Sequence, residues 1–445
     1  MSKSGITRRT FLAGAAVAAA GCAAGPRIAI KEPAYLAPTE KLNIATIGAG
    51  GRGRSLTHQC STENIVALCD VDDDRAARTY DEFPNARRFK DYRKMLDEMS
   101  AEIDAVIIAT PDHTHAVAAL AAMQLGKHVY VEKPLTHNIK EARALKEAAR
   151  RYGVVTQMGN QGHSNEGTRQ LCEMIWSDWI GPIHTVHQWT NRPGDLWRQG
   201  VDTPPEEPVP DHLDWDLWLG PRAYRPFSSA YVPHDWRGFW DFGTGSLGDM
   251  GCHIMDPGYW ALQLGAPTSV EVVKQEGATD VSGPTHSIVR YHFPERPNMP
   301  AVTVNWHDGG ELPERPEWLD DDEQIGDGAN GSMFIGEKGV LTCGEYGGNP
   351  RLLPARLMED REMPEPMIMR SIGHYQEWVQ ACKGGPECMS NFDYAGPFTE
   401  TVLLGTLALR TNERLVWDAD NMRVSNLPAA NEYIEGEYRR GWELA

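Results

Sequence analysis

A glycine-rich turn that directly follows a short apolar strand constrains the fold of this chain more than any other feature. Residues 42–47 are mostly apolar and lead into a GxGxxG sequence formed by Gly48, Gly50, Gly51, Arg52 and Gly53. Helical patterns at 114–125 and 139–152 alternate with further apolar runs at 65–69, 105–109, 129–131 and 154–158. Continuous apolar strands that alternate with helices are typical of a parallel sheet covered on both faces. Residues 41–161 are therefore predicted to form a doubly wound α/β domain.

The same turn carries a chemical prediction. Glycines at a strand-to-helix turn let backbone N–H groups approach a pyrophosphate at the helix N-terminus, as in Rossmann domains that bind dinucleotides. Asp70 ends the second strand, about 20 residues further on, where a carboxylate can accept hydrogen bonds from the adenosine ribose. It would repel a 2′-phosphate, and Asp72, Asp73 and Asp74 add to that repulsion. We therefore expect NAD rather than NADP as the cofactor, the alternative being that Asp70 only caps the next helix.

The pattern changes after residue 161. Val302, Val304 and Trp306 alternate with polar residues, which is the period of a half-buried antiparallel strand. Other strands are predicted near 183–189, 270–274, 287–292 and 332–335, and helices at 374–382 and 399–412. Residues 162–445 are therefore predicted to be an α+β domain with a large, mainly antiparallel open sheet. We expect a Trp- and Pro-rich insertion at 191–240, and C-terminal helices that pack back on the first domain.

Two motifs resemble a known family. Glu132-Lys133-Pro134 stands at the end of the fifth strand, and residues 243–256 read GTGSLGDMGCHIMD. On these motifs the chain resembles the glucose–fructose oxidoreductase/inositol dehydrogenase (Gfo/Idh/MocA) family over most of its length after the N-terminal segment. The resemblance implies an NAD(P)-dependent oxidoreductase of the CH–OH donor type, and a homo-oligomer, either dimer or tetramer.

The resemblance gives three residues catalytic roles. The Lys133 ammonium would hydrogen-bond the reacting alcohol and stabilise developing alkoxide. Asp249 and His253 stand four residues apart and so share one face of a helix, and His253 would be the general base. The residues alone also allow a surface lysine, an aspartate that caps the helix and a histidine of the core. Pro257 follows soon after and predicts a kink, which puts the orientation of Asp256 in doubt.

Further cofactor contacts follow from the resemblance. They are Thr110, Pro111 and His115 on the pyrophosphate and ribose side, Glu132 at the nicotinamide ribose, and Asn160 and Gln161 facing the nicotinamide. His163 lies just beyond and would reach substrate. Each of these residues has an alternative interpretation as a loop cap or turn residue.

The insertion is rich in tryptophan, with Trp189, Trp197, Trp215, Trp218, Trp236 and Trp240 in or beside it. Aromatic faces stack on the C–H faces of sugars, so we expect carbohydrate contact, with Trp236 and Arg237 as the favoured residues. Tryptophan also builds small cores beneath long loops and at subunit interfaces, which is the alternative. His374, which opens a predicted helix, is a further substrate candidate.

Charge and cysteine content argue against several classes of function. The 445 residues carry a formal net charge of −19, which argues against nucleic acid and anionic lipid surfaces as partners. Eight cysteines without CxxC or Cys/His spacing argue against a disulfide scaffold and a zinc site, so no metal is expected.

The N-terminal segment indicates export. Arg8-Arg9 precede a short, mildly apolar stretch that ends near Gly21, which is typical of a Tat signal peptide. Residues 1–40 are predicted to be signal peptide and tether, and the protein to be periplasmic. Cys22 would be acylated as a lipid anchor, the only membrane attachment expected; simple cleavage after a small-residue motif is the alternative.

Together these features predict an exported NAD-dependent oxidoreductase that acts on a CHOH group of a sugar, sugar derivative or polyol. Because free NAD is scarce outside the cytoplasm, we expect the cofactor to be tightly bound and recycled internally. Three alternatives stay open. They are a dehydrogenase with exchangeable NAD, a redox-neutral NAD-dependent glycoside hydrolase, and a non-catalytic carbohydrate-binding lipoprotein.

Overall fold

The computed structural model describes residues 40–444. The predicted Tat signal, with Arg8, Arg9 and Cys22, lies outside the described residues, so export and acylation stay predictions. None of the helices within residues 40–444 combines the length and the apolar character that a membrane span requires.

The first sheet has six parallel strands in the order β3-β2-β1-β4-β5-β6. The strands are β1 (Asn43–Ile47), β2 (Asn64–Cys69), β3 (Arg87–Phe89), β4 (Ala105–Ile108), β5 (His128–Val131) and β6 (Thr156–Met158). Strand order reverses at β1, which pairs with both β2 and β4. In doubly wound sheets, ligands bind outside the carboxyl ends of the strands at such a point. The predicted Rossmann fold is confirmed.

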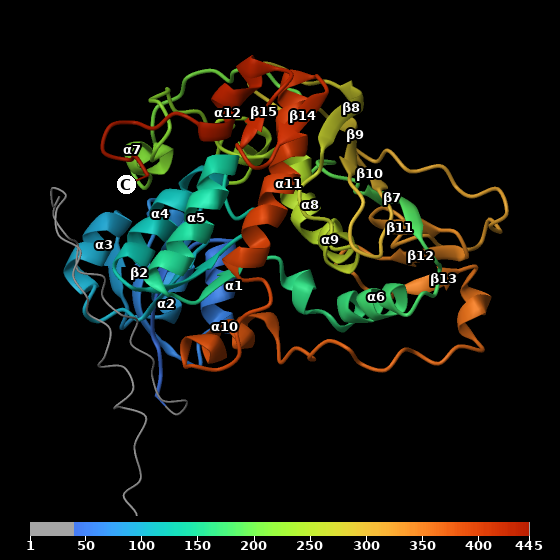
Figure 1. Cartoon of the computed structure of the whole chain (residues 1–445). Helices are drawn as coiled ribbons and strands as arrows, with labels where there is room; N and C mark the ends of the chain where they lie inside the picture. The colour runs from blue at the N-terminus through green and yellow to red at the C-terminus, as the bar shows by residue number, and fades with distance from the viewer. Residues whose placement is uncertain (1–39, 445) are drawn as a thin grey trace, which may run out of the picture.

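Five helices connect these strands and flank the sheet (Figure 1). They are α1 (Arg52–Gln59), α2 (Asp73–Glu82), α3 (Tyr92–Met99), α4 (Asp112–Gln124) and α5 (Ile139–Tyr152). Local sequence sets the ends of α5. Asn138 and Glu141 form a reciprocal capping box, and Gly153 adopts a φ of 61° just after the last turn.

The second sheet has nine strands in the order β13-β12-β11-β7-β10-β9-β8-β14-β15, and only the β7–β10 pair is parallel among those described. Its strands are β7 (Ile183–Trp189), β8 (Ser269–Glu276), β9 (His286–Phe293), β10 (Val302–Asp308), β11 (Gly331–Gly336), β12 (Gly339–Cys343), β13 (Arg351–Leu353), β14 (Leu415–Asp418) and β15 (Arg423–Val424). The mainly antiparallel sheet predicted for the second domain is confirmed.

The remaining α-helices follow β6 in the chain. They are α6 (Glu166–Trp176), α7 (Trp215–Leu219), α8 (Gly245–Ile254), α9 (Asp256–Ala261), α10 (His374–Cys382), α11 (Phe392–Thr411) and α12 (Glu432–Glu435). Trp378 of α10 is buried in one cluster with Leu42 and Ile44 of the first domain. Helix α11 packs against both α5 and α8, as Figure 1 shows. The core is therefore continuous between the two sheets.

The long insertion folds around its own aromatic cluster. Nine buried side chains form it: Leu213, Trp215, Trp218, Leu219, Phe227, Tyr231, Trp236, Phe239 and Phe242. Trp189 and Trp240 belong to other core clusters. Most of the tryptophans singled out above are thus structural, which is the alternative that the sequence left open.

Candidate active site

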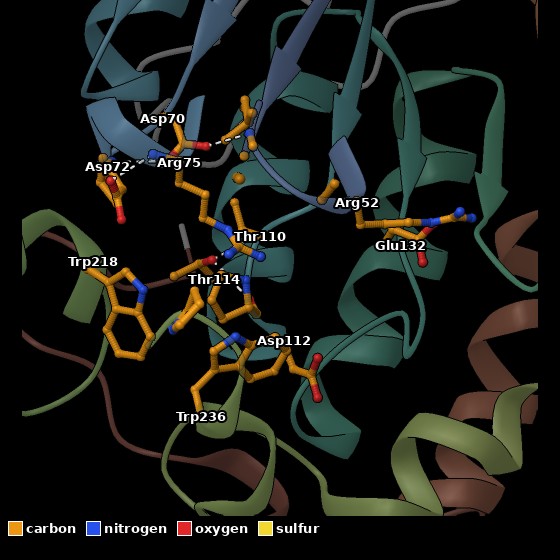
Figure 2. Close-up of a pocket in the computed structure, with 18 of the residues that line it drawn as sticks. Arg52, Asp70, Asp72, Arg75, Thr110, Asp112, Thr114, Glu132, Trp218 and Trp236 are labelled. Carbon is orange, nitrogen blue, oxygen red and sulfur yellow. Dashed lines mark hydrogen bonds and ion pairs between the residues drawn. The ribbon is translucent and has the colours of Figure 1, made fainter. Parts of the chain in front are cut away.

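A cavity of about 450 Å³ opens at the carboxyl ends of the parallel strands, where the first domain meets α8 and the insertion (Figure 2). The predicted site residues that line it are Gly48, Gly50, Arg52, Asp70, Thr110, Pro111, Glu132, Lys133, Gln161, Trp236, Arg237, Asp249 and His253. The structure thus brings together the glycine loop of the first domain and the Asp-His pair of the second.

The glycine loop is shaped by close backbone approaches. Gly48 has a φ of 80°, and a Cβ there would lie 2.6 Å from the carbonyl oxygen of Ala109. A Cβ on Gly53 would collide with the carbonyl oxygen of Gly48. Helix α1 begins directly after Gly51 and points its free N–H groups at this turn. The loop therefore fits the pyrophosphate of a dinucleotide.

Two arginines frame this loop. Arg52 forms a 2.9 Å ion pair with Glu132, the residue predicted at the nicotinamide ribose. The side chain of Arg75 runs from α2 across the cavity toward Thr110 (Figure 2), and its Nη2 lies beside Gly51. Sequence reasoning missed Arg75, because its guanidinium reaches the loop only once α2 has packed beside it.

Asp70 lies at the end of β2, as predicted, and holds the glycine loop. Its carboxylate accepts hydrogen bonds from the backbone N–H groups of Gly50 at 2.7 Å and Asp72 at 3.0 Å. The residue that caps α2 is Asp72, which accepts from the N–H of Arg75. Burial raises the pKa of Asp70 to about 6. Asp72, and not Asp70, therefore caps α2, so the alternative interpretation of Asp70 as a helix cap is wrong.

Replacing Asp70 by Asn should stabilise the cofactor-free protein at neutral pH. Because the pKa rises from 3.8 to about 6 on folding, ionised Asp70 disfavours the folded state. The stabilisation that the protonated form provides is complete below about pH 4 and lost as pH rises through about 6. We expect Asp70→Asn to raise the free energy of unfolding by on the order of 3 kcal/mol at neutral pH and very little near pH 4.

Denaturant unfolding of both proteins at the two pH values measures this difference. The exposed Asp97→Asn is the matched control and should change stability at neither pH. An equal effect of Asp70→Asn at both pH values would contradict the raised pKa.

The three predicted catalytic residues lie in the same cavity. The Lys133 ammonium donates to Asp249 Oδ1 at 2.5 Å and to the Asp249 carbonyl oxygen at 3.1 Å. Arg237 Nε lies 3.2 Å from Asp249 Oδ1. Burial raises the pKa of Asp249, but Arg237 and Lys133 outweigh this and hold it below its ordinary value. Asp249 is therefore ionised between two cations.

His253 follows Asp249 by one turn of α8 and is buried. Its ring meets that of Tyr346 edge-on, with centroids 4.8 Å apart, and its Nδ1 has no hydrogen-bond partner among residues 40–444. Burial and then Lys133 lower the pKa of His253 well below 6.5. The imidazole is therefore neutral at physiological pH and able to accept a proton.

The kink predicted at Pro257 takes the form of a break at Met255, which separates α8 from α9, and Asp256 does not line the cavity. Asp256 accepts hydrogen bonds from Tyr394 at 2.6 Å and contacts His163 Nδ1 at 3.0 Å. His163 is also stacked on Trp260, with ring centroids 4.3 Å apart. His163 therefore belongs to a buried polar pair and does not line the cavity.

Five other predicted residues also fall outside the cavity lining: Gly51 and Gly53 of the glycine loop, and His115, Asn160 and His374. His115 contacts the carbonyl oxygens of Pro134 and Thr110, both at 2.8 Å. Asn160 accepts from Ser390 at 2.5 Å, and His374 contacts Ser164 and the carbonyl oxygen of Met158. These side chains fix loops at the strand ends, so their placement matches the alternative of structural loop residues.

The insertion contributes two side chains at the reacting end. Trp236 and Arg237 both line the cavity, and the Arg237 guanidinium lies 4.4 Å from the centroid of the Trp236 ring. Arg237 Nη1 also lies 3.6 Å from Asp112 Oδ1. Asp112, which the sequence interpretation missed, accepts a 2.8 Å hydrogen bond from Thr244 just before α8. The arrangement ties the first domain to α8.

Residues 40–444 contain no cluster of three or more His, Cys, Asp or Glu side chains that could hold a metal ion.

A Rossmann sheet whose glycine loop shares a cavity with a Lys-Asp-His cluster defines a two-domain, NAD-binding protein of the dehydrogenase class. Two family models match the chain: the NAD-binding Rossmann fold of the Gfo/Idh/MocA oxidoreductase family at residues 42–160, and its C-terminal alpha/beta domain at 176–298. The chain belongs to this family, which confirms the resemblance seen in its motifs.

Curated relatives share part of the chain. Inositol 2-dehydrogenase 2 of Saccharopolyspora erythraea is 33% identical over 163 residues, which cover 35% of this chain and 48% of that protein. Glycosyl hydrolase family 109 protein 1 of Shewanella sp. (strain MR-4) is 33% identical over 146 residues, which cover 30% of this chain and 31% of that protein. The chain thus spans about half, or less, of the length of these relatives.

Solved structures share the fold over most of the chain. The WlbA dehydrogenase of Bordetella pertussis, crystallised with NADH and UDP-GlcNAcA, matches with a TM-score of 0.60 at 17% sequence identity. The match covers 86% of this chain and 100% of that one. At this identity the likeness is one of fold.

Proposed function

We propose that the protein is an NAD-dependent oxidoreductase that oxidises a CHOH group of a sugar, sugar derivative or polyol. The observation that carries this proposal is the hydrogen-bonded Lys133–Asp249 pair, with neutral His253 one turn away, in the cavity that the glycine loop enters. Bound NAD would accept the hydride from the substrate carbon. Lys133 would donate a hydrogen bond to the substrate oxygen, and His253 would take the hydroxyl proton.

Charge balance at the reacting end supports an uncharged substrate group there. Lys133 and Arg237 are cations, and the carboxyls of Asp249 and Asp112 lie against them. Burial raises the pKa of Asp112, with Arg237 opposing that shift, so an added anion would raise it further. A hydroxyl group therefore fits this end better than a carboxylate, which favours a neutral sugar or polyol.

A second candidate is a redox-neutral NAD-dependent glycoside hydrolase. Its support is the sequence similarity to a glycosyl hydrolase family 109 protein. In such a cycle, transient oxidation acidifies a neighbouring C–H, the anomeric group is eliminated, water adds, and the carbon is reduced again.

We also propose that the protein is exported through its twin-arginine segment, retains its cofactor and forms a homo-oligomer.

Substrate screening with the purified protein separates these functions. NADH accumulation with polyols or aldoses and excess NAD would support the oxidoreductase. Cleavage of chromogenic glycosides without net NADH would support the hydrolase. Sugar binding without either reaction would contradict both and support the non-catalytic lipoprotein.

The pH profile of kcat should lack the fall near pH 6.5 that protonation of an ordinary histidine base would cause. The pKa of His253 is lowered, so its neutral form persists as pH falls through 6.5 and is lost only well below that value. We expect kcat, at saturating NAD and substrate, to stay nearly constant as the pH falls from about 8 through 6.5. A fall centred near 6.5 would contradict the role of buried His253 as the base.

A further inference from the structure

The adenosine end of the cavity is covered by two segments that lie far apart in the chain. Asp70 marks that end, because the acidic residue after the second strand faces the adenosine ribose in Rossmann domains. Figure 2 shows Trp218 of α7 on the same side as Asp70 and Asp72, with Glu132 on the opposite side. Figure 1 places the C-terminal end of the chain beside α7, next to α3 and α4.

The insertion is bound to the turn that follows β2. The N–H of Asp73 donates to the carbonyl oxygen of His212 at 3.0 Å, and the N–H of Asp214 donates to that of Val71 at 2.9 Å. His212 Nδ1 also lies 2.9 Å from Asp72 Oδ1. Residues 212–214 therefore extend the acidic turn of the NAD site and bring α7 over it.

The C-terminal segment is in turn bound to α7. Arg439 donates from Nε to the carbonyl oxygen of Gly220 at 2.9 Å and from Nη2 to that of Asp216 at 2.8 Å. Its own N–H donates to the carbonyl oxygen of Pro221 at 2.8 Å. Tyr438, one residue earlier, donates to Glu141 at 2.7 Å. Residues 438–442 thus bridge the insertion and the first domain.

Trp442 ends this bridge at the cavity itself. It is 8% exposed and lines the cavity together with Tyr92, Leu217 and Trp218. The Arg93 guanidinium lies 3.9 Å from the centroid of the Trp442 ring, and the Tyr92 ring meets it edge-on at 6.1 Å. These aromatic and apolar walls suit a flat aromatic ring, and the adenine of NAD is the part that reaches this end.

We propose that residues 438–442 form a latch, fastened by Arg439, whose Trp442 contacts the adenine of NAD and slows its dissociation. The latch rests on the proposed use of NAD. Release of the dinucleotide past this end requires the contacts of Arg439 with α7 to break. The latch would explain why the cofactor is retained. This explanation rests on contacts within the chain and does not require the protein to be exported.

Dissociation of NADH from the full-length protein tests the latch. We expect Trp442→Ala and Arg439→Ala each to release NADH about ten times faster than the wild type, in stopped-flow displacement with excess NAD. ADP-ribose, which carries the adenosine end, should bind Trp442→Ala correspondingly more weakly. Nicotinamide mononucleotide, which lacks that end, should bind it as it binds the wild type.

Matched variants separate the latch from general damage. Arg440→Ala removes an exposed arginine next to Arg439, and Trp318→Ala removes a tryptophan that is 54% exposed and lies outside the cavity lining. Both should release NADH at the wild-type rate. Wild-type release rates in Trp442→Ala and Arg439→Ala would overturn the latch and leave the proposed function standing. Failure of the wild type to bind NAD would overturn both.

Discussion

Replacing Lys133 by Ala should lower kcat by about 10²- to 10⁴-fold and leave the Kd for NAD nearly unchanged. The ammonium group contacts the side chain and the carbonyl oxygen of Asp249, and within residues 40–444 it makes no hydrogen bond or ion pair with the glycine loop. Its loss removes the hydrogen-bond donor that the proposal assigns to the substrate oxygen. Steady-state turnover with the substrate found by screening, and calorimetric titration with NAD, measure the two quantities.

Two further variants define what Lys133 contributes. Lys133→Arg keeps the charge beside Asp249 but replaces a compact ammonium by a planar fork, and we expect it to recover only part of the lost turnover. Lys338→Ala removes an exposed lysine that pairs with Asp178 outside the cavity lining, and turnover should stay at the wild-type level. Near-normal turnover in Lys133→Ala would contradict the catalytic assignment.

The first domain could be predicted because its central strands are buried on both faces and so read as continuous apolar runs. The strand that escaped prediction was β3, where Arg87 and Arg88 are exposed at the edge of the sheet. In the second domain, β13 and β15 span three and two residues, too short for an alternating pattern to show. Their pairing is set by the neighbouring strands.

Helix α11 illustrates a different difficulty. The sequence predicts a helix from residue 399, but the structure begins it at Phe392 and keeps Pro397 inside it. Asn391 caps this helix by accepting from the N–H groups of Asp393 and Tyr394. A proline near the start of a helix is a poor guide to the boundary, because the cap and the packing against α5 decide it.

The candidate site also contains residues that the sequence could place and residues that it could not. Lys133, Asp249 and His253 could be placed from short motifs, since a strand end and one helical turn fix where they lie. His163 and His374 could not, because their partners Asp256 and Met158 lie 93 and 216 residues away in sequence. Trp442 carried no sequence signal at all, since its place in the cavity depends on how the C-terminal segment crosses α7.

Replacing Gly53 by Ala should disrupt the NAD site through the backbone alone. A Cβ at this position collides with the carbonyl oxygen of Gly48, so either the loop or the start of α1 must move. Overpacking of this kind costs about 1–3 kcal/mol, which corresponds to a loss of NAD affinity of about five- to 150-fold if the displaced loop carries the cost. Calorimetric titration with NAD measures it.

The control for this change is Gly348→Ala, because a Cβ at Gly348 meets no atom within 4 Å and the backbone there is not left-handed. It adds the same methyl group to the same chain, so NAD affinity and thermal stability should match the wild type. If Gly53→Ala binds NAD as tightly as Gly348→Ala, the close packing of Gly53 on Gly48 has no part in cofactor binding. A loss confined to Gly53→Ala would place the pyrophosphate at this turn, because the substitution changes no polar side chain and no charge.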